Sequence, residues 1–394
     1  MRITSYLSAL LAFTTTGVVG KNVIGYYPSW KKHHADAMDL RLYTHINFAF
    51  AIPARDGSLF FEGDWFLLQV VSSLHSKGVK AMLSVGGWTG SKHFSPILKD
   101  AAASASLIRN IVRYMQRYDL DGVDLDWEYP GRLGNSCNAF DAEADARNYL
   151  AFLRALRQQM EVAFGPGRKL LTLALRVEPF DGPDGRPLAD VAAFAAVADF
   201  GSLMQFDVNG GWNRTTGPLA PLRCERGKGL QVSFVSAIDA WVRAGWPAGK
   251  LNAGYAFYGR STTALADMTL DPTNQYQPQA KTVPLGDSED APWHDACAGA
   301  TANSGIWQWK HMMKQGVLSG PTKAKAPWVR QWDNTSQTPW VFNPETRVFI
   351  SYDDPQSLQV KVDYAASRGL AGAMVWSLNM DAPSNTLLSV LRGS

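Results

Sequence analysis

The sequence predicts a (β/α)8 barrel, an α/β fold in which eight parallel strands alternate with helices. Short runs rich in Val, Ile, Leu and Phe alternate with longer amphipathic stretches along most of the chain. This alternation is typical of a parallel sheet covered by helices. The chain has 394 residues, of which 46% are hydrophobic, so it can bury the large core that such a barrel requires.

The individual elements follow from local periodicity. In a barrel of this kind, functional side chains lie at the carboxyl ends of the strands, so we expect the site there. The predicted strands are 22–27, 44–51, 80–86, 121–127, 170–176, 202–207, 250–257 and 370–376, and the predicted helices are 104–118, 145–163, 187–199, 230–245 and 356–368.

One interval interrupts the alternation. Residues 262–349 contain no long helical period, and they carry turn signals such as DPT, GDS and NPE. They also include two strand-like patches, SGIWQWK and TRVFISY. This composition indicates short strands and turns between the seventh strand and the helix that follows it. Because no Ser/Thr/Pro-rich linker or separate module flanks the barrel, we expect one domain over residues 21–394.

The first twenty residues have the features of a secretory signal peptide. Arg2 supplies a positive charge, residues 6–13 an apolar stretch, and residues 18–20 a small-residue exit. The stretch is too short and too rich in Thr to span a membrane, and no later apolar run has spanning length. Acceptor sequons at Asn213 and Asn334 are compatible with export. We therefore expect a secreted, extracellular protein that is not attached to a membrane.

Charge and cysteine content narrow the possibilities further. The 38 basic side chains exceed the 35 acidic ones by a net charge of only +3, which is not the excess that nucleic-acid binding requires. Cys137, Cys224 and Cys297 allow one disulfide and one free thiol, and the sequence does not determine which pair forms. Loop-like surroundings favour the pairing of Cys224 with Cys297.

The run DGVDLDWEYP at residues 121–130 is the most informative segment. Asp124, Asp126 and Glu128 alternate with apolar residues, and this period of two places the three carboxylates on one face of a strand. Burial and mutual repulsion require at least one of them to hold a proton at neutral pH. A proton held at a strand end is what general acid catalysis requires. The alternatives, a hydrated acidic turn or a calcium loop, do not account for the apolar backing.

This run resembles the DxxDxDxE signature of glycoside hydrolase family 18, the chitinases and their relatives. All four acidic positions match, and SVGG at 84–87 resembles the family's SxGG box on the preceding strand. The resemblance covers essentially the whole chain after residue 20, and the secreted fungal members are most similar. It implies that residues 262–349 are the family's α+β insertion between strand 7 and helix 7, which forms one wall of the groove. Further fragments in the family's order are VIGYY at 23–27, INFAF at 46–50, LMQFD at 203–207, YGR at 258–260 and MVWSL at 374–378.

The resemblance implies a role for each acidic residue. Glu128 would protonate the glycosidic oxygen and later accept a proton from water, while Asp126 would hydrogen-bond the substrate's acetamido group and stabilise the positive intermediate. Asp124 would share a proton with Asp126 and tune both. Asp121, which is out of phase, is expected to be structural. Ser84 is expected to donate a hydroxyl to the buried carboxylates.

The same resemblance predicts the residues that contact substrate. Trp376 is expected to form the floor beneath the distorted sugar, and Trp88 to stack on a sugar of the leaving group. Trp30 and Trp293 are candidates for extending the groove. The full set of predicted contacts is Tyr26, Phe50, Trp88, Tyr129, Met204, Phe206, Asp207, Tyr258, Arg260 and Trp376.

Two residues depart from the family pattern. Relatives usually have Tyr in place of Phe206, and the missing hydroxyl would help to hold the acetamido oxygen. Arg176 replaces a small residue, and we expect its long side chain to narrow the groove. Neither departure removes a catalytic carboxylate.

Together these residues predict a chitinase that hydrolyses β-1,4 bonds between N-acetylglucosamine units with retention, through an oxazolinium ion. Two alternatives stay open: a chitin-oligomer-binding lectin or decoy with weak activity, and an endo-β-N-acetylglucosaminidase acting on N-glycans. The expected partners are chitin and chitin oligosaccharides, and the chain is expected to act as a monomer. We expect no cofactor and no metal, since the sequence has no His/Cys cluster of recognisable ligand spacing.

Overall fold

The computed structural model describes residues 21–295 and 297–392, so the predicted signal peptide at residues 1–20 lies outside the described part. The predicted barrel is present. Its parallel strands pair side by side in chain order, and the last strand pairs with the first. The short strand β3 (Leu59–Phe61) adds an antiparallel edge to β2. The barrel strands are β1 (Asn22–Pro28), β2 (His45–Pro53), β4 (Lys80–Gly86), β5 (Gly122–Asp126), β6 (Leu170–Leu175), β7 (Phe200–Leu203), β8 (Leu251–Ala256) and β18 (Gly372–Trp376).

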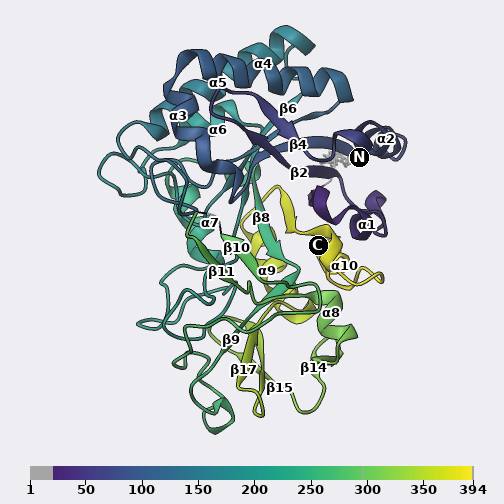
Figure 1. The fold of residues 1–394 in the computed structure, drawn as a ribbon, viewed down its shortest axis with the longest axis vertical. Coiled ribbons are helices and arrows are strands. Elements are labelled where there is room, and N and C mark those ends of the chain that lie inside the picture. The colour runs from purple at the N-terminus through teal and green to yellow at the C-terminus, as the bar shows by residue number, and fades with distance from the viewer. Residues whose placement is uncertain (1–20, 296, 393–394) are drawn as a thin grey trace, which may run out of the picture.

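Helices cover the outside of the barrel, with α3 to α6 gathered at the top of Figure 1. Side-chain caps define where several helices begin. The Asp100 carboxylate accepts the first free N–H groups of α4, and Asp354 forms a capping box with Ser357 at the start of α9. The helices are α1 (Lys32–Ala35), α2 (Asp64–His75), α3 (Phe94–Lys99), α4 (Ala101–Tyr118), α5 (Asp145–Phe164), α6 (Ala192–Val197), α7 (Phe234–Arg243), α9 (Pro355–Ser367) and α10 (Thr386–Arg392).

Some elements differ from the sequence prediction. Helices α2 and α10 were not predicted; in α2, exposed Trp65 and Leu68 stand between the buried residues and obscure the apolar period. Helix α6 covers only part of the predicted range 187–199. Strand β7 ends at Leu203, so residues 204–207 extend beyond the strand, above the barrel.

The predicted insertion lies between β8 and α9 and forms the lower part of Figure 1. It begins at Tyr258, before the predicted residue 262, because β9 pairs with both β12 and β17 in a five-stranded antiparallel sheet. Its own small core contains Trp340, Phe342 and Phe349. The elements are β9 (Tyr258–Thr263), β10 (Trp293–Asp295), β11 (Ala300–Ala302), β12 (Ile306–Gln308), α8 (Trp309–Lys314), β13 (Leu318–Gly320), β14 (Lys323–Ala324), β15 (Val329–Asp333), β16 (Thr338–Asn343) and β17 (Val348–Ser351).

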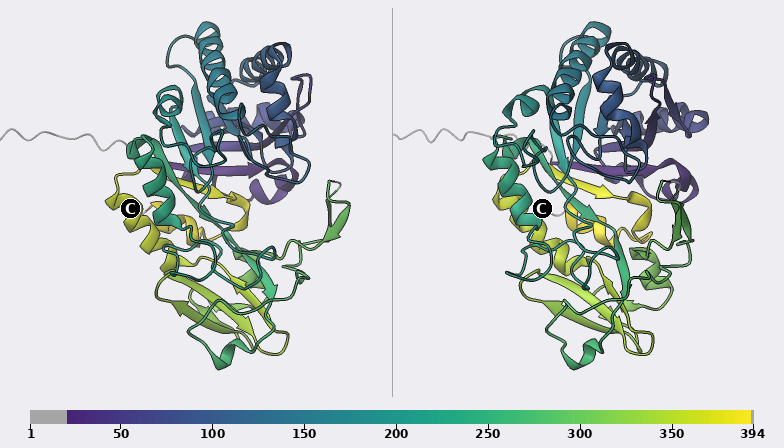
Figure 2. Two further views of the ribbon diagram at one scale, coloured as in Figure 1. Left: turned by 90° about the vertical axis from the view of Figure 1, so that its left-hand side faces the viewer. Right: turned by 60° about the vertical axis from the view of Figure 1, so that its left-hand side comes forward.

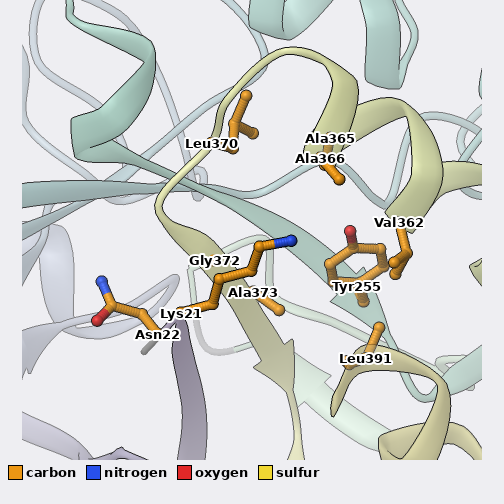
Figure 3. Close-up of a pocket in the computed structure, with 10 residues that line it drawn as sticks. All are labelled: Lys21, Asn22, Tyr255, Val362, Ala365, Ala366, Leu370, Gly372, Ala373 and Leu391. Atoms are coloured by element: carbon orange, nitrogen blue, oxygen red, sulfur yellow. The ribbon is translucent and has the colours of Figure 1, made fainter. Parts of the chain in front are cut away.

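The amino ends of the barrel strands form a packed base. A cavity of ≈ 20 Å³ lies there between β1, β18, α9 and α10, and its lining is largely apolar, including Val362, Leu370 and Leu391 (Figure 3). This volume suits about one water molecule. Within residues 21–295 and 297–392, no helix combines the length and apolarity needed to cross a membrane.

The disulfide joins Cys137 and Cys297, which are 160 residues apart in the sequence, and Cys224 is a free thiol. The expected pairing of Cys224 with Cys297 is therefore wrong. Loop-like composition does not say which loops meet. The barrel brings the loop after β5, which carries Cys137, to the same end of the molecule as the β10–β11 hairpin of the insertion.

Candidate active site

Strand β5 presents its acidic residues to the inside of the barrel, with the alternation predicted from the sequence. Val123 and Leu125 pack in the core between strands and helices. Trp127 continues this outer layer and stacks on Phe94 of α3, with ring centroids 5.3 Å apart. The opposite face of the strand is therefore left to the carboxylates.

Asp124 lies deepest in this row and accepts three hydroxyl hydrogen bonds. Tyr26 Oη and Ser84 Oγ donate to Oδ2 over 2.7 and 2.8 Å, and Thr172 Oγ1 donates to Oδ1 over 2.6 Å. The strand register explains this geometry, because Ser84 of β4 and Thr172 of β6 stand directly beside Asp124. Burial raises the pKa of Asp124, and the three donors oppose that rise. Both oxygens of Asp124 thus accept hydrogen bonds from hydroxyl groups. The proton that Asp124 is expected to share with Asp126 stays a prediction.

Asp126 is buried but has an unused acceptor. Among the described residues, its Oδ1 has no hydrogen-bond partner, although buried polar atoms in folded proteins are nearly always paired. Burial holds the pKa of Asp126 well above its usual range, and the negative charges of Glu128 and Asp124 add to this effect. The site therefore contains a buried acceptor that no described residue satisfies.

Glu128 lies at the mouth, just beyond the end of β5. Burial raises the pKa of Glu128 to about 7; a hydrogen bond from Tyr129 lowers it and the charge of Asp207 raises it. Two loops hold the main chain of Glu128. Its N–H donates to Ser91 Oγ over 2.9 Å, and its carbonyl oxygen accepts from Asn138 Nδ2 over 2.9 Å. The carboxyl group is thus positioned on a fixed backbone and can hold a proton near neutral pH.

Two glycines let strand β4 approach this row. Gly86 has a φ of +113°, and a Cβ there would lie 2.2 Å from the carbonyl oxygen of Asp126. Gly87 has a φ of +79°, and a Cβ there would lie 2.6 Å from the ring of Phe50. Any other residue would be strained and would also collide. The pair therefore turns the chain at the mouth and leads to Trp88, which is 45% exposed.

Aromatic rings from three barrel strands lie together beside the carboxylates. Trp376 and Phe50 are stacked, with centroids 5.5 Å apart and planes inclined by 13°. Tyr26 lies 5.6 Å from Trp376, and Trp30, which is 51% exposed, stacks on Phe50 at 6.2 Å. Flat apolar surfaces of this kind suit the C–H faces of pyranose rings.

Residues that follow β7 form a second group with residues of β9. Arg260 donates to both oxygens of Asp207, over 2.6 and 3.1 Å. Phe206 meets Tyr258 edge to face with centroids 6.2 Å apart, and Met204 packs beside Phe206 against the inner barrel cluster. These residues and the aromatic rings are the ones the sequence predicted to line one groove.

Two further residues singled out from the sequence have hydrogen-bond or ion-pair partners outside this group. Asp121 is at the amino end of β5, where it accepts from the N–H of Ala81 over 2.7 Å and contacts His75 Nε2 at 2.9 Å. Arg176 is buried and paired with Asp181 at 3.1 Å and with Glu178. Its positive charge also opposes the rise in the pKa of Tyr129 that burial causes, and the expectation that Arg176 narrows the groove stays a prediction.

Sequence reasoning missed two residues of the site. Thr172 carries the one hydroxyl in the apolar run LLTLAL of β6. A hydroxyl within an otherwise apolar strand is the signal that could have identified this residue. Trp212 is 57% exposed and its ring lies 5.1 Å from the Arg260 guanidinium. It stands in an irregular loop after β7, where no periodicity marks it. Among the described residues, no group of three or more His, Cys, Asp or Glu is placed to hold a metal ion.

Comparison with known proteins agrees with this geometry. A family model described as glycosyl hydrolases family 18 matches residues 22–381. A chitinase-like effector of Moniliophthora roreri is 34% identical over 385 residues, covering 94% of this chain and 92% of that protein. Chitotriosidase-1 of Mus musculus is 28% identical over 384 residues, covering 91% and 73%. The crystal structure of a chitinase from Rhizomucor miehei superposes with a TM-score of 0.87 at 36% identity, covering 95% of this chain and 99% of that one. The chain belongs to the glycosyl hydrolases family 18 and is a glycoside hydrolase of the chitinase type.

Proposed function

We propose that the protein hydrolyses β-1,4 bonds between N-acetylglucosamine units by substrate-assisted catalysis with retention of configuration. The observation that carries this proposal is the buried Oδ1 of Asp126, which has no partner among the described residues and lies in a row with a proton-holding Glu128. An acetamido N–H is a donor that would satisfy this oxygen. Ordinary retaining glycosidases use a second carboxylate as nucleophile, whereas in this family the substrate's own acetamido oxygen takes that role.

The reaction divides between the two residues. Glu128 gives its proton to the glycosidic oxygen as the bond to the anomeric carbon breaks, and the acetamido carbonyl oxygen bonds to that carbon. Asp126 accepts the acetamido N–H and its negative charge offsets the positive oxazolinium ion. Water then bonds to the anomeric carbon as the bond from the acetamido oxygen to that carbon breaks, and the water gives a proton to Glu128, which restores the acid. Two displacements on opposite faces retain the configuration.

The surroundings of the carboxylates suit a chain of sugars. The mouth carries the stacked rings of Trp376, Phe50 and Trp30 and the exposed ring of Trp88, which follows β4. Sugar rings bind such surfaces through their apolar faces, so the rings are the proposed subsites for chitin and its oligosaccharides.

Product analysis on the N-acetylglucosamine hexamer tests this proposal. NMR of the first products is expected to show the β anomer, and a chelator is expected to leave the rate unchanged. First products of α configuration would contradict substrate-assisted retention. Hexamer that binds without being cut would contradict the assignment of Glu128 as a working acid.

A second candidate is binding of chitin oligomers with little turnover. It is favoured by the 34% identical relative, which is named a chitinase-like effector, and by the ring of Phe206, which offers no hydroxyl at its position. The hexamer experiment separates the two candidates, because a binding protein retains the oligomer intact.

We also propose that the protein acts outside the cell. Support comes from the Cys137–Cys297 disulfide, since such bonds persist in oxidising compartments, and from the leader predicted at residues 1–20. Expression in a secreting host should place the protein in the medium, with an amino terminus near Lys21. A protein that stays inside the cell with reduced cysteines would contradict this proposal.

A further inference from the structure

One part of the insertion leaves its sheet and returns to it. We call its residues 287–295 and 297–304 the strap. Two carboxylates fix the base of the strap on the insertion. Asp287 accepts the N–H of Gln308 over 2.8 Å, and Asp290 accepts the N–H of Gly305 over 3.0 Å. The base is therefore a hydrogen-bonded part of the sheet that carries Tyr258.

The far end of the strap is fixed beside the acid. Strands β10 and β11 form a hairpin, and the Asp295 carboxylate accepts the N–H of Cys297 in its turn over 2.8 Å. The disulfide then joins Cys297 to Cys137. The next residue, Asn138, donates to the carbonyl oxygens of both Glu128 and Trp88. The strap thus ends covalently on the loop that holds the acid's backbone.

The two ends of the strap lie on different sides of the barrel mouth. Its base follows β8 and its anchor follows β5, and the barrel order β8-β7-β6-β5 separates these strands. A second crossing joins Lys31, in the loop after β1, to Glu289 of the strap over 2.9 Å. In the left view of Figure 2 the green hairpin stands beyond the carboxyl ends of the barrel strands and reaches from the insertion toward the upper half.

We infer that the strap closes the active-site groove from above, so that a chitin chain must enter by one of its ends. A covalent crossing next to Glu128 prevents the interior of a long polymer from being laid sideways into the groove. The inference rests on the proposed function and deepens it, since it makes chain ends the preferred substrate. Trp293, which is 46% exposed, stands on the strap.

The experiment compares viscosity loss with new reducing ends on carboxymethyl chitin. Cuts near chain ends release sugar with little loss of viscosity, whereas interior cuts lower viscosity steeply. Wild type is expected to lose little viscosity for each new reducing end. Cys137→Ser/Cys297→Ser, and a variant with a Gly/Ser linker in place of residues 293–302, are expected to lose more viscosity per new reducing end than wild type does. Cys224→Ser, which removes a thiol but no disulfide, is the matched control.

The viscosity curve of wild type can overturn the inference when it is compared with the curves of the opened variants or of an interior-cutting enzyme. If wild type lowers viscosity as steeply as the opened variants, or as steeply as any interior-cutting enzyme, the strap does not restrict entry. If the disulfide only stabilises the fold, its loss would lower the melting temperature of the double variant. The viscosity lost per new reducing end would then be the same as in wild type. Absence of hexamer hydrolysis by wild type would count against the proposed function instead. In that case, the rate at which a labelled hexamer is released would test whether the strap closes the groove. Release is expected to be slower from wild type than from the opened variants.

Discussion

Two buried pairs of aspartates, Asp353 with Asp354 and Asp124 with Asp126, differ in whether a cation lies beside them. Asp353 and Asp354 lie between β17 and α9. Lys361 Nζ is 2.6 Å from both oxygens of Asp353, and Arg330 Nη2 is 2.7 Å from Asp354. These ion pairs attach the insertion to the helix that follows it, because Arg330 comes from β15 and Lys361 from α9.

The second pair, Asp124 and Asp126, is buried as deeply but has no cation at hydrogen-bond distance among the described residues. Asp124 is satisfied by neutral hydroxyls, and one oxygen of Asp126 is unpaired. Arg260, from the opposite group of the site, already pairs with Asp207. Burial raises the pKa of Asp354 too, but the Arg330 guanidinium opposes that rise. In the described part of the chain, no cation opposes the rise at Asp124 and Asp126, so protons remain available there for chemistry.

The largest expected effect concerns Glu128, the acid that lies beyond Asp124 and Asp126 at the mouth of the barrel. In Glu128→Gln the amide keeps the shape of the side chain but has no proton of suitable acidity to give. Hydrolysis of the hexamer is expected to fall about 10²–10⁴-fold, the usual contribution of general acid catalysis, while hexamer binding is retained. Steady-state kinetics and calorimetry measure the two quantities. A variant with more than about a tenth of wild-type turnover would refute the assignment.

The pair Asp353 and Asp354, which has cations beside it, predicts an effect on stability rather than on activity. Lys361→Met leaves Asp353 buried without its cation, and breaking a buried pair in this way typically costs about 3–5 kcal/mol of unfolding free energy. Denaturant unfolding measures the loss. The double variant Lys361→Met/Asp353→Leu removes both charges and is expected to recover most of the stability. A single variant as stable as wild type would show that the pair does not hold the insertion to α9.

Asp126→Asn sharpens the contrast, because its effects on activity and stability should have opposite signs. Loss of the charge that offsets the oxazolinium ion is expected to reduce turnover about 10²–10³-fold, the scale of a lost electrostatic stabiliser. The unfolding free energy at pH 7 is expected to equal or exceed that of wild type, since an unpaired buried carboxylate is removed. If unfolding experiments show a marked loss of stability, Asp126 is a structural residue like Asp353.

The pH dependence follows from the pKa of about 7 at Glu128. The acid must be protonated, so kcat/KM is expected to fall about tenfold per pH unit once pH exceeds this value. Between the unfolded pKa near 4.5 and about 7, the folded state binds more protons than the unfolded state. Stability should therefore decrease as pH rises through that window. Glu128→Gln should lack this contribution, and a wild-type rate that keeps rising to pH 9 would contradict the assignment.

The smallest effect concerns Phe206, which lies between the two groups of the site and packs edge to face on Tyr258. A hydroxyl at this position would help to hold the acetamido oxygen. Phe206→Tyr is expected to raise turnover on the hexamer about 3- to 30-fold, the equivalent of one hydrogen bond that strengthens in the transition state. Phe200→Tyr, deeper in the same inner cluster, is the control. An unchanged or lower kcat in a folded Phe206→Tyr variant would show that Phe206 only packs.

Several features could be predicted because they depend on neighbours in the chain. A period of two is enough to place Asp124, Asp126 and Glu128 on one face of β5, and the barrel strands could be located within a few residues. The same local reasoning failed at α2, where exposed Trp65 and Leu68 obscure the period, and it could not see that residues 204–207 continue beyond β7.

The sequence by itself determined the barrel, the acidic row and the presence of an insertion, since each is written in periodicity or in contiguous motifs. Only the tertiary structure decided the partners of these residues. Thr172 reaches Asp124 through the register of two strands 48 positions apart. Arg176 pairs with Asp181, and Cys297 bonds to Cys137 rather than to Cys224. Such contacts depend on which distant segments the closed barrel brings together, and no local pattern records that.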